Sequence, residues 1–152
     1  MTFIQARRAS TLVIAIVALT SSLITLSATA ADTTACVTNF TAKGNMFSGK
    51  KFDTWQEFPK VTTADAFKRV YAAVVKEGWT IVSADKELGA ISASQEVSFS
   101  EGGKAVPMNI LVEAAPAGGT KVSMTFALTG GVMGGTKTVQ EGFCKFMAAI
   151  DI

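Results

Sequence analysis

Apolar residues recur at spacings of three and four after Pro59, and this pattern predicts an amphipathic helix over residues 64–77. Thr62 is a suitable N-cap, and Asp65 lies near the positive end of the helix dipole. Gly78 can adopt the left-handed conformation that ends a helix. The apolar stripe of this helix consists of Phe67, Val70, Tyr71, Val74 and Val75.

Alternating apolar and polar positions predict four strands in the second half of the chain. Their expected ranges are residues 79–84, 90–99, 106–112 and 122–128. In the second strand one face is apolar and is broken once by Gln95; it consists of Ile91, Ala93, Val97 and Phe99. The connections are of hairpin length, so we expect an antiparallel sheet with one apolar and one polar face.

A last apolar stripe at helical spacing ends the chain and consists of Val139, Phe143, Phe146, Met147 and Ile150. Two amphipathic helices and a sheet with one apolar face bury these surfaces best against each other. The sequence therefore predicts an α+β domain over residues 61–152. We expect a two-layer sandwich in the order α-β-β-β-β-α, with a four-stranded antiparallel sheet covered on one face by two helices.

The segment of residues 31–60 has no clear period and is interpreted as a loop-rich lead-in. Its best candidate for an extra N-terminal strand is Lys51–Phe58. There the aromatic residues Phe52, Trp55 and Phe58 recur every three positions instead of alternating. This spacing disagrees with the period of a strand, so the extra strand is the less certain part of the architecture.

The first thirty residues have the three parts of a secretory signal peptide. Arg7 and Arg8 precede the apolar run Thr11–Leu26, and the small residues Ala28 and Ala30 follow it. We expect Sec export, cleavage after Ala30 and a periplasmic or secreted domain without a stable membrane span. The alternative is an uncleaved N-terminal membrane anchor, which leaves the domain in the same compartment.

Charge and composition exclude several classes of function. The chain has no histidine, which removes the commonest general base and metal ligand, so we expect no enzyme activity, metal or cofactor. Loss of the signal peptide removes Arg7 and Arg8 and leaves 12 basic and 12 acidic residues. A neutral chain with scattered lysines does not favour nucleic-acid binding.

Cys36 and Cys144 are the only cysteines, and an even number in an exported protein predicts a disulfide. The bridge would tie the N-terminal segment to the last helix. The alternative is a lipid-modified N-terminus at Cys36. The preceding residues Thr33, Thr34 and Ala35 lack the leucine typical of a lipoprotein signal, so the disulfide is favoured.

A glycine-rich segment precedes the last helix and consists of Gly130, Gly131, Val132, Met133, Gly134 and Gly135. It is similar to a phosphate-binding loop, but Thr136 stands where that motif has lysine and Lys137 comes one position late. We therefore interpret it as a strand-to-helix connection. It is also a candidate for a mobile contact loop, because glycine permits many backbone conformations.

The polar face of the expected sheet carries small side chains around one apolar residue, namely Ser92, Ser94, Asn109, Leu111, Ser123 and Thr125. Such a face can dock an envelope protein or polymer, and this is the first functional hypothesis. The second is a small carrier or sensor of an apolar or amphipathic, lipid-like ligand between helices and sheet. Trp55, Tyr71 and Trp79 are its candidate pocket residues.

The segment AFKRVYAAVVKEGWTIVSADKELGAISAS, residues 66–94, has a helix ending at Gly-Trp, a strand, an acidic turn and a second strand with small polar residues. Residues 62–150 resemble small exported bacterial cell-envelope domains with this order. Among these are the repeated domains of the lipoprotein accessory subunit of the outer-membrane β-barrel assembly machinery. The resemblance implies a shared fold and an envelope location.

Overall fold

A computed structural model describes residues 34–96, 105–131 and 134–152. The elements are α1 (Thr34–Thr38), β1 (Thr41–Asn45), β2 (Gly49–Phe58), α2 (Thr63–Lys76), β3 (Thr80–Asp85), β4 (Ala90–Glu96), β5 (Ala105–Ala114), β6 (Thr120–Leu128) and α3 (Thr136–Ala148). Within these residues, no helix has the length and apolar character needed to span a bilayer. The predicted signal peptide, Val97, Phe99, Val132 and Met133 lie outside the described residues.

The sheet has six antiparallel strands in the order β1-β2-β6-β5-β4-β3, so the predicted four-stranded sheet is wrong. The four expected strands are present as β3 to β6. β2 pairs with β6 from Lys50 opposite Leu128 to Phe58 opposite Thr120. β1 then pairs with β2 as an edge strand. The stretch interpreted as loop-rich thus supplies one short helix and one side of the sheet.

The misleading period in β2 has a physical explanation. Phe52, Thr54, Gln56 and Phe58 alternate on the buried face, whereas Trp55 points to the opposite face and is exposed. Because two of these four buried residues are polar, apolar residues do not recur at every second position, as a half-buried strand would require. A three-residue spacing of aromatic side chains remains visible because Trp55 belongs to the other face.

The helix predicted at residues 64–77 is confirmed as α2. The backbone N–H of Asp65 donates to the Thr62 hydroxyl over 3.1 Å, which satisfies one free donor of the first turn. At the other end Gly78 has φ +83°. The backbone N–H groups of Gly78 and Trp79 donate to Val75 and Val74, forming a Schellman motif that ends the helix.

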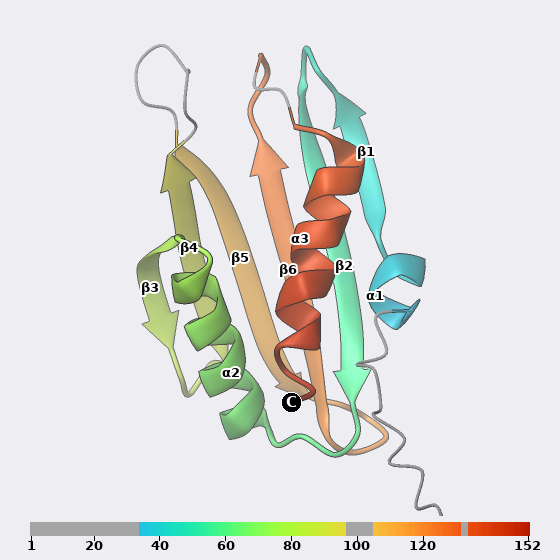
Figure 1. Cartoon of the computed structure of the whole chain (residues 1–152), viewed down its shortest axis with the longest axis vertical. Coiled ribbons are helices and arrows are strands. Elements are labelled where there is room, and N and C mark those ends of the chain that lie inside the picture. The colour runs from blue at the N-terminus through green and yellow to red at the C-terminus, as the bar shows by residue number, and fades with distance from the viewer. Residues whose placement is uncertain (1–33, 97–104, 132–133) are drawn as a thin grey trace, which may run out of the picture.

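All three helices lie on one face of the sheet, as Figure 1 shows. In this view α2 crosses the side formed by β3, β4 and β5, while α3 lies over β6 and β2. The core between the layers contains side chains that are almost completely buried, among them Phe52, Val70, Ile91, Met108, Val122, Met124, Met147 and Ile150. The other face of the sheet has no helix over it in the described part of the chain.

Candidate functional site

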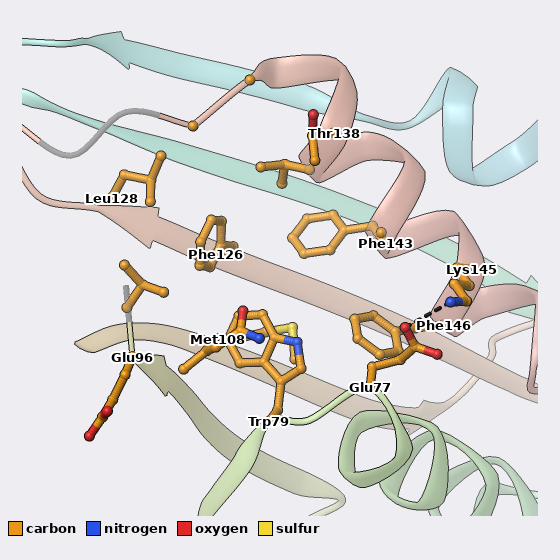
Figure 2. A pocket seen from close by; sticks show the side chains of 16 residues that line it. Glu77, Trp79, Glu96, Met108, Phe126, Leu128, Thr138, Phe143, Lys145 and Phe146 are labelled. Atoms are coloured by element: carbon orange, nitrogen blue, oxygen red, sulfur yellow. Dashed lines mark hydrogen bonds and ion pairs between the residues drawn. The ribbon is translucent and has the colours of Figure 1, made fainter. Parts of the chain in front are cut away.

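A cavity of about 400 Å³ lies between α3, the sheet and the first residues after α2. Figure 2 shows its side chains converging from these three directions. Eight large apolar side chains line it, namely Trp79, Val106, Met108, Phe126, Leu128, Val139, Phe143 and Phe146. The volume is within the range of small-molecule sites, and the apolar lining with a few polar groups is typical of them.

The end of α2 places two residues of the cavity wall. Glu77 is the C-cap, and the left-handed turn at Gly78 reverses the chain so that Trp79 packs against the core. The ring of Trp79 meets the ring of Phe126 edge to face, with centroids 5.8 Å apart. Phe126 in turn stacks on Phe52 at 6.0 Å. These contacts favour a fixed orientation for the aromatic wall on the sheet side.

The α3 wall is formed by one helix face. Residues 135, 138, 139, 142, 143 and 146 border the cavity, which is the three-and-four spacing of one side of a helix. Gly134 precedes this helix and fits tightly, since a Cβ there would lie 2.5 Å from Cδ1 of Leu128. Glycine at this position therefore lets the start of α3 approach β6.

Charged and polar groups occupy parts of the cavity border. The Lys145 ammonium donates to Oε2 of Glu77 over 2.7 Å and links α3 to the end of α2 (Figure 2). Their side chains are 66% and 33% exposed, so this pair belongs to the border and not to the apolar interior. Gln95, Glu96 and Thr138 complete the polar groups. Such a site can hold an apolar body with a polar end.

The described residues contain no group of three or more acidic or cysteine side chains placed to hold a metal ion. Cys36 and Cys144, the two cysteines of the chain, are both used in a disulfide. The residues that line the cavity offer apolar surface, aromatic rings and an ion pair at its border.

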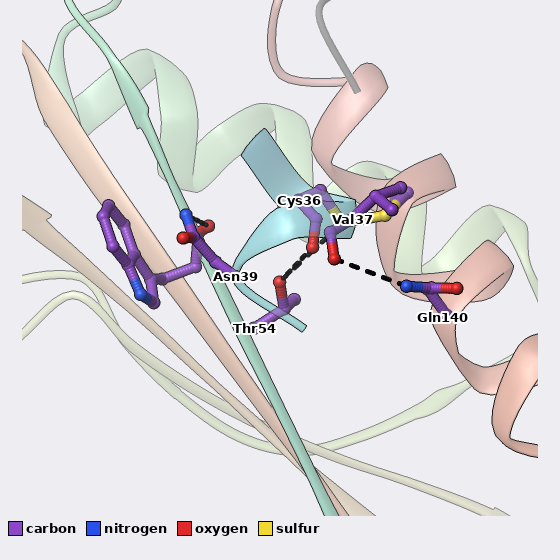
Figure 3. Close-up of a disulfide and its surroundings, with 7 residues drawn as sticks. Cys36, Val37, Asn39, Thr54 and Gln140 are labelled. Atoms are coloured by element: carbon purple, nitrogen blue, oxygen red, sulfur yellow. Dashed lines mark hydrogen bonds between the residues drawn. A yellow bond between two sulfur atoms is a disulfide. The ribbon is translucent and has the colours of Figure 1, made fainter. Parts of the chain in front are cut away.

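The predicted disulfide between Cys36 and Cys144 is confirmed, and it joins α1 to α3 across 108 residues of sequence (Figure 3). Next to it, the Gln140 amide donates to the Val37 carbonyl over 3.4 Å. On the other side of α1 the buried Thr54 hydroxyl donates to the Cys36 carbonyl over 2.7 Å. The short helix α1 thus connects the cavity helix α3 to strand β2.

The residues predicted as a partner-binding face do lie on one face of the sheet. In adjacent strands Thr125, Asn109 and Ser92 form one row, and Ser123 and Leu111 are neighbours in the next. Their side chains form hydrogen bonds with residues on neighbouring strands. The Ser92 hydroxyl donates to Oδ1 of Asn109 and the Thr125 hydroxyl to Oδ1 of Asp53, both over 2.8 Å.

Two large apolar residues flank Ser123 on this face. Trp55 pairs with Ser123 from β2, and Leu111 pairs with it from β5. They are 41% and 38% exposed. The Lys121 ammonium lies 5.1 Å from the centre of the Trp55 ring, in the range of a cation–π contact.

The structure divides the glycine-rich segment into two parts. The backbone N–H of Gly131 donates to the Met46 carbonyl over 3.0 Å, and a Cβ on Gly130 would clash with the Phe47 carbonyl. This first part therefore packs on the turn between β1 and β2. Gly134 and Gly135, at the start of α3, border the cavity instead.

Of the three aromatic residues predicted for a ligand pocket, Trp79 alone lines this cavity. Trp55 is on the opposite face of the sheet, and Tyr71 is exposed beside Phe67, with ring centroids 6.4 Å apart. The other seven large apolar lining residues lie in the predicted strands and in the apolar stripe of the last helix, where the sequence predicts only core packing. The sequence signal for space beside the last helix is Gly142, which falls between Val139 and Phe143 of its apolar stripe.

Comparison with known proteins identifies no family for the chain. No protein-family model matches, and no curated protein matches. Among solved structures, the crystal structure of Ara h 8.0201 aligns with a TM-score of 0.40 and 14% sequence identity, covering 68% of this chain and 96% of that chain. The resemblance to bacterial envelope domains stays a prediction.

Proposed function

We propose that the protein is a small, non-enzymatic binding protein that holds an apolar or amphipathic ligand between α3 and the sheet. The observation that carries the proposal is the 400 Å³ cavity with eight large apolar side chains. Side chains that line an empty cavity lack packing contacts, which lowers the free energy of unfolding. A bound apolar ligand would restore these contacts.

The border of the cavity supports an amphipathic ligand as well as a purely apolar one. The Glu77–Lys145 pair and Thr138 can hydrogen-bond a polar end group while the ligand body contacts Phe143 and Phe146. The absence of histidine from the chain supports binding in preference to catalysis. The Cys36–Cys144 disulfide fits a protein exported to an oxidising compartment.

A dye titration tests this function. N-phenylnaphthylamine is neutral and fluoresces when it enters an apolar site, so the purified protein is expected to raise its fluorescence in a saturable manner. Val139→Asp places a carboxylate on the cavity wall and is expected to weaken binding by about tenfold or more, because burying a charge against the apolar dye is unfavourable.

The matched control is Val75→Asp, which makes the same change on the exposed surface of α2, outside the cavity lining. Its dye affinity is expected to equal that of the wild type. Circular dichroism checks that both variants are folded. Absence of saturable binding to the wild type, or equal loss in both variants, would contradict a ligand site in the cavity.

A second candidate function is docking of an envelope protein or polymer on the open sheet face, favoured by the exposure of Trp55 and Leu111 around Ser123. A photo-reactive residue at Ser123 is expected to crosslink one partner in the native envelope. Lysine substitutions at Ser94, Asn109 and Thr125 should abolish this crosslink, and circular dichroism checks that the variant is folded; glutamate is unsuitable because Asp53 lies opposite Thr125. An unchanged crosslink in the triple variant would reject this candidate.

A further inference from the structure

Gly142 is the central residue of the helix that forms one wall of the cavity, the seventh of thirteen in α3. Glycine is the poorest helix former except proline, because it loses the most backbone freedom on folding. A glycine in a helix interior therefore calls for a reason in its surroundings. The usual reasons are a left-handed backbone or a close approach by another part of the chain.

Neither reason applies at Gly142. It is not among the glycines with positive φ, and a Cβ built on it meets no heavy atom within 4 Å. The contrast with Gly134 is direct, since a Cβ there would lie 2.5 Å from the Leu128 side chain. An alanine at position 142 is therefore compatible with both the backbone and the neighbouring side chains.

The position of Gly142 beside the cavity offers another explanation for a glycine in the interior of α3. It lines the cavity, with Thr138 one helical turn before it and Phe146 one turn after it on the same helix face. The space that a side chain at 142 would fill is therefore continuous with the cavity. Removing a side chain here widens the site at the level of its aromatic wall.

We propose that Gly142 is a specificity-determining residue that widens the cavity for a ligand bearing a planar ring system, in preference to a single alkyl chain. This inference rests on the proposed binding function. A ring is wider than a methylene chain and needs the space beside α3. The rings of Trp79, Phe126, Phe143 and Phe146 line the same cavity and can pack against it at offset or edge-to-face angles.

The test compares a ring ligand with a linear one on three forms of the full protein. N-phenylnaphthylamine is the ring probe, and dodecanol, followed by calorimetry, is the linear probe. Gly142→Leu is expected to weaken the dye by about tenfold or more, as steric exclusion from a shaped pocket does, and dodecanol by less than about threefold. Gly142→Ala is expected to give a smaller loss for the dye alone.

Glu141→Leu adds the same side chain to the adjacent, exposed position of α3 and controls for added apolar bulk. It is expected to leave both affinities unchanged. Both Gly142 variants are expected to melt at or above the wild-type temperature, because alanine and leucine are better helix formers than glycine. A melting temperature measured at or above that of the wild type would show that a loss of dye binding does not come from unfolding.

The outcomes separate this inference from the function on which it rests. Selective loss of the dye in Gly142→Leu supports the inference. Wild-type binding of both probes with no change in Gly142→Leu, or with equal loss of both, overturns it and leaves the cavity function standing. Failure of the wild type to bind either probe overturns the proposed function and the inference together.

Discussion

Two polar side chains on the buried face of β2 hide the hydropathy pattern that would identify this strand from the sequence. Thr54 is 2% exposed and Gln56 is 5% exposed, although both lie on the buried face of β2. Thr54 is accommodated because its hydroxyl donates to the Cys36 carbonyl of α1. Sequence patterning could not anticipate that acceptor, since it comes from another element eighteen residues away. The hydropathy of this buried strand therefore shows no period of two.

Thr54→Val is expected to destabilise the protein by about 1–3 kcal/mol, because the isosteric side chain leaves the Cys36 carbonyl without its hydroxyl donor. Urea unfolding measures the change. Thr41→Val, at an exposed position of the edge strand β1, is the control and should shift stability by no more than about 0.5 kcal/mol. Equal effects at the two positions would show that the buried hydrogen bond contributes nothing.

Two glycines provide a matched pair for backbone conformation. A Cβ at either Gly142 or Gly78 meets nothing within 4 Å, but Gly78 alone has a positive φ. Gly142→Ala is expected to stabilise the protein by about 1 kcal/mol. Gly78→Ala is expected to destabilise it by about 1 kcal/mol, because alanine is strained in the left-handed region. Thermal unfolding checks both signs, and the same sign in both variants would refute the explanation.

At the scale of elements, the helices and strands predicted in the second half of the chain are present in the structure. In this half the hydrophobic positions follow a regular helical or strand period. α2 begins directly after the predicted N-cap Thr62, and its end is followed by the predicted left-handed residue Gly78. β6 alternates perfectly between buried and half-buried positions, which is the pattern that its hydropathy shows. Here each local preference agrees with the burial imposed by the fold, so reasoning from the sequence was sufficient.

The hydropathy of the N-terminal elements α1 and β1 does not predict them. All five residues of β1 are exposed, so nothing in their hydropathy alternates. This strand exists because β2 supplies its hydrogen-bonding partner, as in the pairing of Ala42 with Phe52. α1 is only five residues long and depends on the disulfide at Cys36. Elements stabilised by tertiary partners cannot be predicted from their own residues.

The disulfide makes a prediction about the α1–α3 connection. Replacing both Cys36 and Cys144 with serine is expected to cost up to about 4 kcal/mol, since the bridge closes a loop of roughly one hundred residues in the unfolded chain. The same variant is expected to bind N-phenylnaphthylamine more weakly, because α3 loses its covalent link to α1. Urea unfolding and dye titration measure the two effects.

Reduction of the wild type with dithiothreitol should reproduce the loss of stability, whereas the serine variant should not respond to the reductant. A double-serine variant as stable as the oxidised wild type would contradict the role assigned to the bridge. Unchanged dye affinity in a folded variant would show that α3 keeps its place without this link.

At the scale of the whole molecule, α3 is anchored to the rest of the chain and also forms one wall of the cavity. The C-terminal half of α3 is held by the disulfide at Cys144 and by Lys145 on Glu77, and the residues that follow the helix are held by the Arg69 guanidinium, which donates to the Ile150 carbonyl over 2.7 Å. Met147 and Ile150 are completely buried there. The cavity runs beside the same helix, from Thr138 and Val139 in its first half to Phe143 and Phe146 in its second half.

The apolar stripe of α3 can be predicted from the sequence, whereas the cavity beside it cannot. Periodicity identifies the side of α3 that faces the sheet, as Phe143 and Phe146 show. It carries no information on the separation between helix and sheet, which depends on attachments such as Cys144 and Arg69. A cavity and a filled core therefore produce the same hydrophobic pattern.

The most direct test of the central claim uses the two tryptophans of the chain. Trp79 lines the cavity, whereas Trp55 lies exposed on the open sheet face. Their indole N–H signals are recorded by NMR in ¹⁵N-labelled protein, assigned with Trp55→Phe, and followed while N-phenylnaphthylamine is added. A ligand site between α3 and the sheet predicts a saturable shift of the Trp79 signal and none of Trp55; a shift of Trp55 alone, or of neither, would contradict it.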